Sequence, residues 1–258
     1  MAKNDSANVI AVRQKANEIR REKERAEFRR RTLIQVGVVV GALLLVAAIV
    51  VAVIFATRGS SAVNVPNASA TITVDDKAGV PLAVGDHRVR IGADDAAVVL
   101  SIYEDYSCPH CKDYAEETDS TLTELIALGD VAVEFLPIRF VTDYGSRAGS
   151  AATCVAVGAP EQWLDVHTAL YDNFDATTNG WSNDQFRDFL SSQGVTDKAV
   201  LECVADGEYV DWIQQSTAAA TEAGITSSPT LLINGEKSEL LSAAELRAAV
   251  DKLLEADE

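Results

Sequence analysis

The feature that most limits how this 258-residue chain can fold is a long segment without charge. It extends from Thr32 to Thr57 and reads TLIQVGVVVGALLLVAAIVVAVIFAT. About 20 apolar residues in a helix cross the hydrocarbon core of a bilayer, so residues 32–57 predict one transmembrane helix. The basic sequence EFRRR comes directly before this segment, and basic flanks stay in the cytoplasm. We therefore expect residues 1–31 to be a cytoplasmic basic tail of a single-pass protein of the cell membrane, with the C-terminal part extracytoplasmic.

A cleavable signal peptide is the alternative interpretation of this segment. The apolar part of a signal peptide usually has about 7–15 residues behind a short basic start. Here the apolar part is longer and follows 31 residues, which favours an uncleaved signal-anchor. The next segment, 58–79, begins with small, polar and proline residues, and we interpret it as a flexible tether and N-terminal extension. ATITVD and HRVRIG alternate enough to be short strands, so the folded region should start near residue 70.

Charge is distributed unevenly along the chain. Residues 1–31 contain ten Lys or Arg and five Asp or Glu, whereas the remainder contains 12 basic and 34 acidic residues, which gives a net charge of −17. Nucleic-acid phosphates repel a domain this acidic, so we expect no nucleic-acid partner. Such a surface is typical of a soluble, solvated domain, and we expect a monomer.

Apolar periodicity predicts an α/β domain over residues 80–258. Ala96–Asp105 and Val131–Phe140 are apolar segments typical of buried strands, and a helical pattern lies between them. A strand, a helix and a strand within so short a segment form a βαβ unit. From residue 146 to about 205 the patterns are helical, and a helix, a strand and a last helix follow. This order predicts a sandwich domain with a helical subdomain inserted in its middle.

A Cys-x-x-Cys sequence, Cys108-Pro109-His110-Cys111, lies between the first buried strand and its helix. Such a pair can bind a metal, form a structural disulfide or exchange electrons. A structural zinc site usually has two such pairs, and the sequence has no second one. A purely structural disulfide across one helical turn is strained. We therefore expect no metal site and favour a redox function.

The expected position of Cys108 supports this interpretation. Pro109 disfavours helical geometry at Cys108 and suits the first turn of a helix. Cys108 should then lie at the helix N-terminus, where unpaired N–H groups and the helix dipole stabilise a thiolate. We expect its pKa in the lower half of the range of roughly 3.5–7.5 that such thiols have. Cys108 should attack, and Cys111, one turn further and facing the interior, should resolve.

The sequence SCPHC after a buried strand, the helical insertion and the later sequence ITSSPTLLING closely resemble DsbA-type thiol–disulfide oxidoreductases. The resemblance covers about residues 80–258 and is strongest to the membrane-anchored actinobacterial type. It implies a thioredoxin fold with an inserted helical subdomain, preceded here by a single N-terminal transmembrane helix. It also implies a dithiol oxidase that introduces disulfide bonds into exported proteins, and we expect no cofactor.

The resemblance also implies roles for individual residues. It implies a cis peptide bond before Pro229, with the backbone of Ser228 facing the substrate. His110 would tune the thiolate by charge and hydrogen bonding. Cys154 and Cys203, both in the insertion, are either buried free thiols or, as we expect for an exported protein, a structural disulfide.

Proton handling is where the sequence departs from the family pattern. Many thioredoxin-fold enzymes carry a buried acid six residues before the first cysteine, as a proton relay to the resolving thiol. That residue is Ile102 here. Glu104 is a substitute for the relay, although we expect Glu104 and Asp105 to lie nearer the surface. His167 belongs to an amphipathic helical pattern, which indicates helix packing rather than catalysis.

The resemblance further implies two kinds of partner. Reduced exported proteins would be the substrates, and a quinone-linked membrane partner of the DsbB or vitamin-K-epoxide-reductase-like type would re-oxidise the enzyme. Two other functions fit the same sequence. One is a disulfide isomerase or reductase on the same fold, although the tether before residue 70 is too short for a separate dimerisation domain. The other is a non-enzymatic, chaperone-like module that binds peptides around Pro229.

Overall fold

The computed structural model of the protein describes Val46 and residues 63–256. The predicted transmembrane helix and the cytoplasmic tail lie outside these residues, apart from Val46. In the described part of the chain, no helix combines the length and the apolar character that crossing a membrane requires. Residues from 63 onwards belong to one compact unit, Ala62–Glu258, with its own hydrophobic core.

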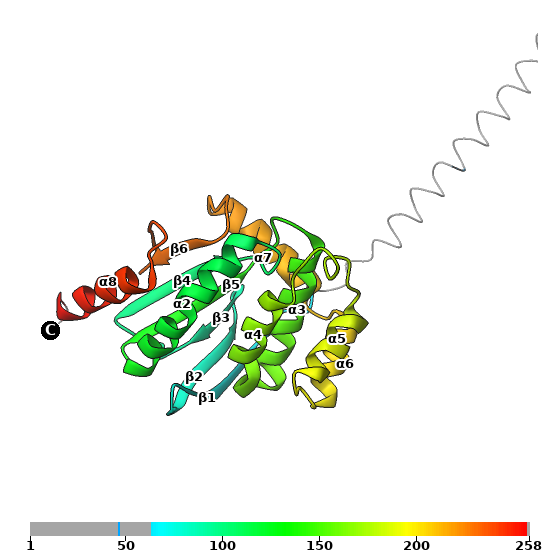
Figure 1. Cartoon of the computed structure of the whole chain (residues 1–258), viewed down its shortest axis with the longest axis horizontal. Coiled ribbons are helices and arrows are strands. Elements are labelled where there is room, and N and C mark those ends of the chain that lie inside the picture. Colours follow the sequence, from blue (N-terminus) through cyan, green and yellow to red (C-terminus); the bar gives the residue numbers. More distant parts are fainter. Residues whose placement is uncertain (1–45, 47–62, 257–258) are drawn as a thin grey trace, which may run out of the picture. The chain divides into compact units, whose positions relative to one another are not determined.

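The core of this unit is a seven-stranded mixed sheet with the order β1-β2-β3-β5-β4-β6-β7 (Figure 1). Within it, β4 pairs with β5 in parallel, and the other neighbouring strands pair antiparallel. The strands are β1 Ala68–Val74, β2 Lys77–Gly85, β3 Arg88–Ile91, β4 Val98–Glu104, β5 Val131–Pro137, β6 Thr230–Ile233 and β7 Glu236–Lys237.

Burial explains why the parallel pair lies near the middle of the sheet. Most side chains of β4 and β5 are buried, and they point alternately to both faces. Strands of this kind occur where helices cover both faces of a sheet. Helix α2 (Pro109–Leu128) connects β4 to β5 and packs against the C-terminal helix α8 (Ala243–Ala256). Helix α7 (Val210–Glu222) also packs against β5.

A helical insertion lies between β5 and β6 (Figure 1). Before α7 it consists of α3 Asp143–Gly158, the 3-10 helix η1 Pro160–Gln162, α4 Trp163–Asp172, α5 Asn183–Ser192 and α6 Lys198–Asp206. Local sequence sets these helix starts: Ser182 and Gln185 form a capping box at α5, and the Asp197 side chain caps α6. The predicted α/β architecture with an inserted helical subdomain is therefore confirmed.

The folded region starts close to residue 70, as predicted, and the strand expected in ATITVD is β1. The expected N-terminal extension is therefore not separate from the domain, because β1 and the first residues of β2 belong to the sheet. The reason is the alternation in ATITV, which turns Ile72 and Val74 into the core, where both are almost fully buried. The strands β1 and β2 therefore extend the sheet beyond β3, and β1 forms its edge.

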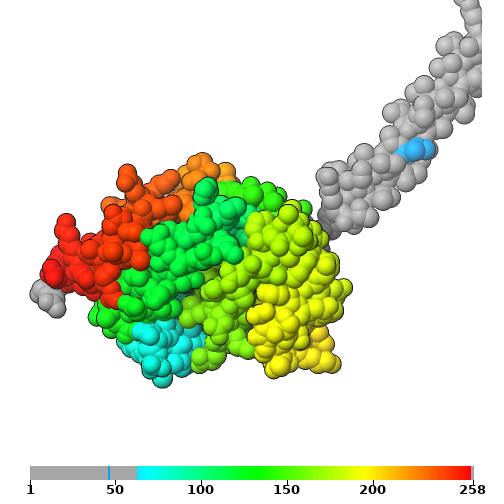
Figure 2. Space-filling model, in the orientation of Figure 1, coloured from blue at the N-terminus to red at the C-terminus, as the bar shows by residue number. Residues whose placement is uncertain are grey.

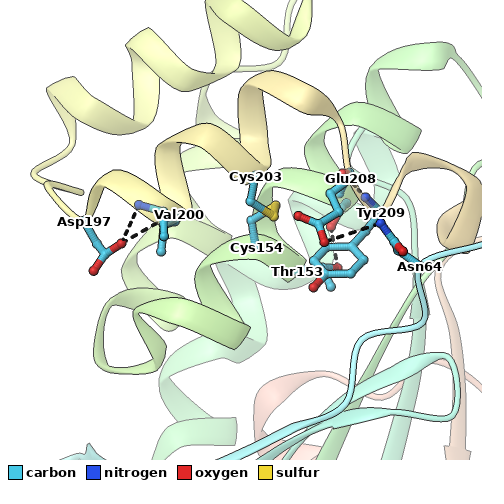
Figure 3. The surroundings of a disulfide bond; sticks show 11 residues. Asn64, Thr153, Cys154, Asp197, Val200, Cys203, Glu208 and Tyr209 are labelled. Atoms are coloured by element: carbon cyan, nitrogen blue, oxygen red, sulfur yellow. Dashed lines mark hydrogen bonds between the residues drawn. A yellow bond between two sulfur atoms is a disulfide. The ribbon is translucent and has the colours of Figure 1, made fainter.

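A disulfide joins Cys154 of α3 to Cys203 of α6 (Figure 3). This is the pairing expected for an exported protein. Cys154 is 1 % exposed, whereas Cys203 is partly exposed. Near the same helices, the side-chain amide of Asn64 donates a hydrogen bond to Glu208 at 3.4 Å, as Figure 3 shows. The bridge connects positions 49 residues apart and so ties the two helices of the insertion together.

On the face of the unit that Figure 2 shows, neighbouring elements pack side by side. The C-terminal helix and the segment around α2 lie at one end of this face, and α5 with α6 lies at the other. Helix α4 lies between these ends and contacts both α2 and α3. The insertion therefore contacts α2, which contains Cys111 and begins directly after Cys108.

Candidate redox site

Cys108 is the N-cap residue of α2. Its φ and ψ angles of −96° and 117° are extended, and Pro109 is the first helical residue. The Cys108 carbonyl accepts hydrogen bonds from the N–H groups of Cys111 and Lys112, at 3.0 and 3.1 Å. The Cys108 sulfur therefore lies at the positive end of a 20-residue helix. Both Cys108 and Cys111 are free thiols, so the structure shows the dithiol state.

A distant loop approaches the Cys108 sulfur. The Ser228–Pro229 peptide bond is cis, which is the isomer that the resemblance implies. The Cys108 thiol donates a hydrogen bond to the Ser228 carbonyl oxygen at 3.4 Å. Pro229 lines the same small cavity as Cys111. The structure thus brings together the two segments from which a thiol site and a substrate-facing backbone were expected.

The surroundings move the pKa values of the two thiols apart. A hydrogen bond from the Cys111 side chain lowers the pKa of Cys108 to about 5, although burial opposes this shift. Hydrogen bonds from the Cys111 and His110 backbones and from the Ser228 side chain add to the lowering. The same bond between the sulfurs, together with burial, raises the pKa of Cys111 far above its ordinary value. At neutral pH the site therefore holds a Cys108 thiolate and a Cys111 thiol.

His110 acts on Cys108 through its backbone in this structure. Its side chain is exposed, and the hydrogen bond that lowers the pKa of Cys108 comes from the His110 main chain. The expected hydrogen-bonding contribution is therefore a main-chain one. Tuning of the thiolate by the charge of the His110 side chain stays a prediction.

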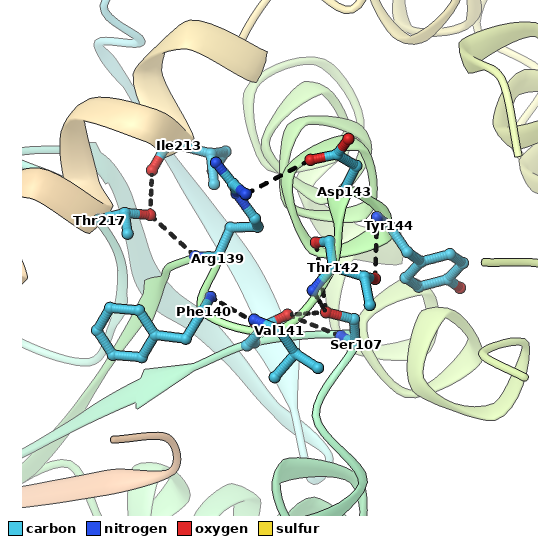
Figure 4. Close-up of polar contacts among 10 residues, drawn as sticks. Ser107, Arg139, Phe140, Val141, Thr142, Asp143, Tyr144, Ile213 and Thr217 are labelled. Atoms are coloured by element: carbon cyan, nitrogen blue, oxygen red, sulfur yellow. Dashed lines mark hydrogen bonds and ion pairs between the residues drawn. The ribbon is translucent and has the colours of Figure 1, made fainter. Parts of the chain in front are cut away.

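Asp105 holds the loop before α2 in place. Its fully buried carboxylate accepts hydrogen bonds from the N–H groups of Ser107, Phe140 and Val141 and from the Ser107 hydroxyl. The Ser107 hydroxyl oxygen also accepts a bond from the Thr142 N–H at 3.0 Å (Figure 4). Four donors satisfy the buried carboxylate, which therefore ties the loop before α2 to the loop after β5.

Glu104, the last residue of β4, lies in a different place from the one expected. Glu104 is 4 % exposed and Asp105 is 0 % exposed, so the expectation that both lie nearer the surface is wrong. The reason for Glu104 is α4, which covers the end of β4. Nε2 of His167 lies 3.0 and 3.1 Å from the two Glu104 carboxylate oxygens, and the Tyr171 hydroxyl donates to one of them at 3.3 Å.

His167 therefore does more than pack α4 against the core. Its ring nitrogen faces a buried carboxylate that is 63 residues away in sequence. The sequence contained one signal for this pairing, which is that His167 and Tyr171 are four residues apart and so share a helix face. Sequence reasoning could not show which acid that face meets. In the described residues, no group of three or more His, Cys, Asp or Glu side chains is placed to bind a metal ion.

Comparison with known proteins identifies the fold. The sequence matches the model of a thioredoxin family, Thioredoxin_4, over residues 85–252. The crystal structure of reduced DsbA from Mycobacterium tuberculosis has a TM-score of 0.57 and 24% identity, covering 65% of this chain and 92% of that chain. MdbA, a thiol-disulfide oxidoreductase from Corynebacterium diphtheriae, has a TM-score of 0.54 and 26% identity, covering 68% and 91%. The predicted thioredoxin fold is confirmed.

Curated relatives show the same similarity at lower coverage. Disulfide bond formation protein D of Bacillus subtilis (strain 168) is 22% identical over 147 residues, which are 56% of this chain and 66% of the relative. A putative protein-disulfide oxidoreductase of Rickettsia bellii (strain RML369-C) is 23% identical over 186 residues, 68% of each chain. The chain thus spans just under two thirds of the first relative and just over two thirds of the second.

Proposed function

Because the chain belongs to this thioredoxin family, we propose that it is an extracytoplasmic thiol–disulfide oxidoreductase that introduces disulfide bonds into exported proteins. Among the similar proteins, one is named a disulfide bond formation protein and another a thiol-disulfide oxidoreductase. The observation that carries the proposal is the geometry at the start of α2, where Cys108 is the N-cap residue and its sulfur lies 3.4 Å from the carbonyl oxygen of Ser228, which precedes the cis-proline. The pKa values of the two thiols support it. The pKa of Cys108 is about 5, and that of Cys111 is raised far above its ordinary value.

The reaction uses both sulfurs in sequence. A substrate thiolate attacks the Cys108 sulfur of the enzyme disulfide, so that a substrate–Cys108 disulfide forms and Cys111 leaves as a thiolate that takes up a proton. The second thiolate of the substrate then attacks the substrate sulfur of this mixed disulfide. A substrate disulfide forms, and Cys108 leaves as a thiolate. The low pKa of Cys108 makes it a good leaving group in this second step.

The same pKa favours an oxidase over a reductase. Only the reduced enzyme has a thiolate to stabilise, because a disulfide carries no charge. At pH 7 a Cys108 pKa of about 5 lies two units below the pH, which corresponds to roughly 3 kcal/mol in favour of the reduced enzyme. This is an upper value, because solvent and salt at the active-site surface screen the charge. For a two-electron couple it equals roughly 60 mV of added oxidising power.

The substrate would bind along the loop that approaches Cys108. The Ser228 carbonyl accepts a hydrogen bond from the Cys108 thiol at 3.4 Å in the dithiol state. When Cys108 has no proton, this carbonyl is free to accept an N–H group of an extended substrate chain. Pro229 would line the groove beside it, next to the Cys111 cavity.

Location and re-oxidation complete the proposal. Residues 32–57 would anchor the chain in the cell membrane, with the thioredoxin-fold unit outside. Reduced exported proteins would be the substrates. A quinone-linked membrane partner of the DsbB or vitamin-K-epoxide-reductase-like type would return the Cys108–Cys111 pair to the disulfide. The net negative charge of the chain, −17, argues against nucleic acid as a further partner.

Oxidation of a reduced protein substrate tests the function. The full-length chain, purified in detergent and oxidised, is mixed with reduced, unfolded ribonuclease A, and free substrate thiols are counted by alkylation and mass spectrometry. We expect the substrate to lose two thiols for each enzyme disulfide consumed. Cys108→Ser should abolish the loss, and Cys111→Ser should accumulate a mixed disulfide on Cys108. Substrate thiols that stay free beside oxidised enzyme would rule out the oxidase, and preferential repair of scrambled ribonuclease would indicate an isomerase.

A further inference from the structure

The polar side chains beneath Cys111 form a series that reaches the protein surface. Cys111 and Glu104 line one cavity, His167 pairs with Glu104, and Asp119 lies beside His167. We propose that Glu104, His167 and Asp119 carry protons between Cys111 and solvent, with His167 as the group that holds the proton between turnovers. This inference rests on the proposed oxidase function and deepens it.

The reaction requires such a path because Cys111 changes its protonation state twice in each cycle. When a substrate thiolate attacks Cys108, the sulfur–sulfur bond to Cys111 breaks and Cys111 needs one proton. When the enzyme is re-oxidised, Cys111 must lose that proton before its sulfur attacks the mixed disulfide on Cys108. Cys111 is only 3 % exposed, so its proton needs a route through the protein.

The inner end of the path is a cavity of about 10 Å³ between Cys111 and Glu104. This volume is about what one water molecule needs, provided that it finds two to four polar partners. The lining supplies them, because the side chains of Tyr114 and Tyr171 also border the cavity. The Tyr114 hydroxyl is buried and has no hydrogen-bond partner among the described residues. One water in this cavity would connect the Glu104 carboxylate to the Cys111 sulfur.

The strand geometry explains why Glu104 can take this role. Side chains two residues apart on a strand point to the same face. Ile102 and Glu104 are two residues apart on β4, and both line the cavity beside Cys111. The Glu104 side chain is therefore on the face of β4 that faces Cys111 of α2 and His167 of α4.

His167 forms the middle of the path. Its Nε2 atom faces Glu104, and its Nδ1 atom lies 3.9 Å from the Asp119 carboxylate. The rings of Trp163 and Phe135, each with its centroid 5.0 Å from that of His167, hold the imidazole in this orientation. The two ring nitrogens therefore face two different acids, one buried and one close to the surface.

The outer end of the path is a second cavity of about 200 Å³, which His167 and Asp119 both line. Its rim includes the exposed residues Ser120, Asp165 and Thr168. The Asp119 side chain is 29 % exposed, so this cavity opens to solvent. The distance of 3.9 Å between His167 and Asp119 is too long for a direct hydrogen bond but suits transfer through one water.

The charges around His167 favour the protonated form of its ring. The ionisable groups that face it are Glu104, Asp119, Asp165 and the hydroxyls of Tyr106 and Tyr171. Burial lowers the pKa of His167, but the charges of Glu104 and Asp119 outweigh burial and raise it. Burial is also the main reason why the pKa of Asp119 is raised. The groups around His167 therefore favour a protonated imidazole, as a group that holds the proton between turnovers requires.

The test separates the two sulfur steps of re-oxidation. Reduced full-length enzyme in detergent is mixed with glutathione disulfide, quenched in acid at short times and analysed by mass spectrometry. Attack by Cys108 gives a glutathionylated enzyme, and attack by Cys111 then releases glutathione. At pH 7 we expect His167→Gln and Glu104→Gln to slow the second step about 100-fold and to leave the first step within about twofold of wild type.

The matched control is His87→Gln. His87 lies between β2 and β3, where its Nδ1 is 3.0 Å from the Ser216 hydroxyl oxygen and its ring stacks on Trp212. It is thus a half-buried histidine with a hydrogen bond and an aromatic neighbour, but it is not part of the proposed path. His87→Gln should leave both steps unchanged. If the second step of His167→Gln matches that of His87→Gln, the proposal is wrong.

The pH profile distinguishes proton transfer from a structural role. In wild type, the rate of the second step should rise with pH and then reach a plateau. In His167→Gln, this rate should keep rising about tenfold per pH unit, because hydroxide replaces the internal base. Asp119→Asn, at the solvent edge of the path, should also slow the second step and tests the route if His167→Gln does not fold. An unchanged rate of the second step in Asp119→Asn would show that protons do not reach solvent through Asp119. Both glutathione steps can be measured even if protein substrates are not oxidised. Failure of the proton path can therefore be distinguished from failure of the proposed oxidase function.

Discussion

The Cys108 sulfur lies 3.4 Å from the carbonyl oxygen of Ser228, a residue 120 positions later in the chain. The first group belongs to the start of α2 and the second to the loop before β6. The nucleophile and the backbone that would receive a substrate are therefore supplied by different parts of the fold. Loss of the Cys108 proton frees the carbonyl at the same moment as it creates the thiolate.

The hydrogen bond from Cys111 should control the acidity of Cys108. It is the largest cause of the low Cys108 pKa of about 5. Cys111→Ala removes the donor and should raise the pKa of Cys108, whereas Cys111→Ser keeps a hydroxyl donor and should leave it near 5. Thiolate absorbance at 240 nm, followed against pH, measures each value. Equal values in the two variants would show that the helix terminus, not Cys111, sets the acidity.

The reduction potential should change its pH dependence near pH 5. Between the two thiol pKa values, reduction consumes one proton, and below the pKa of Cys108 it consumes two. For a two-electron couple each proton contributes about 30 mV per pH unit. The slope should therefore be about 60 mV per unit below pH 5 and about 30 mV per unit above it. Equilibration with redox buffers between pH 4 and about 8, with quantification of the disulfide by mass, gives this slope.

The same shift predicts how stability depends on redox state. The lowered pKa of Cys108 stabilises the reduced protein relative to one with an ordinary thiol. This stabilisation is fully present above a pH of about 8.5 and is lost below a pH of about 5. The Tm of the reduced protein, measured against that of the oxidised protein, should therefore lose this contribution as pH falls from 8.5 towards 5. A Tm difference independent of pH in this window would contradict a thiolate at Cys108.

Asp105 should be essential for the stability of the site rather than for its chemistry. Asp105→Asn places an amide among four donors, so at least one N–H loses its acceptor, and we expect a loss of about 2–4 kcal/mol in the free energy of unfolding. Asp197→Asn is the matched control, because Asn caps a helix about as well as Asp. Denaturant unfolding of both variants measures the difference. Equal stability of the two variants would show that the Asp105 contacts contribute little.

The Cys154–Cys203 disulfide should stabilise the fold without affecting electron transfer. It connects residues 49 positions apart, and the chain-entropy relation gives about 4 kcal/mol for a loop of this size, as an upper value. The double variant Cys154→Ala, Cys203→Ala should be destabilised by up to this amount. The pKa of Cys108 should stay at its wild-type value, because neither residue contacts the start of α2. A changed thiolate titration would show that the bridge also shapes the redox site.

The proposed topology can be tested in cells. Residues 32–57 are uncharged and follow a basic tail, which predicts that the folded unit lies outside the membrane. A protease that cannot cross the membrane should then remove the unit from spheroplasts, while a cytoplasmic marker protein stays intact. Survival of the unit until the cells are lysed would contradict the topology.

The sequence predicted the parts of the site that depend on neighbouring residues. Pro109 and the following helical pattern were enough to place Cys108 at a helix start, because helix capping is local. The pairing of Glu104 with His167 was not predictable in this way. It arises from the packing of α4 over the end of β4, between positions 63 residues apart. For the same reason the burial of Asp105 was missed, since two of its donors, Phe140 and Val141, follow a different strand.

The bridge between α3 and α6 makes this chain a client of the kind of reaction that we propose for it. Cys154 is 1 % exposed, so its thiol must be oxidised before or while α6 closes over α3 during folding. A newly made copy therefore requires an oxidant to complete its own fold. Mature copies could meet that need, since each carries a transferable disulfide at Cys108 and Cys111. A few mature molecules passed on at cell division would then be enough to oxidise Cys154 and Cys203 in newly made copies.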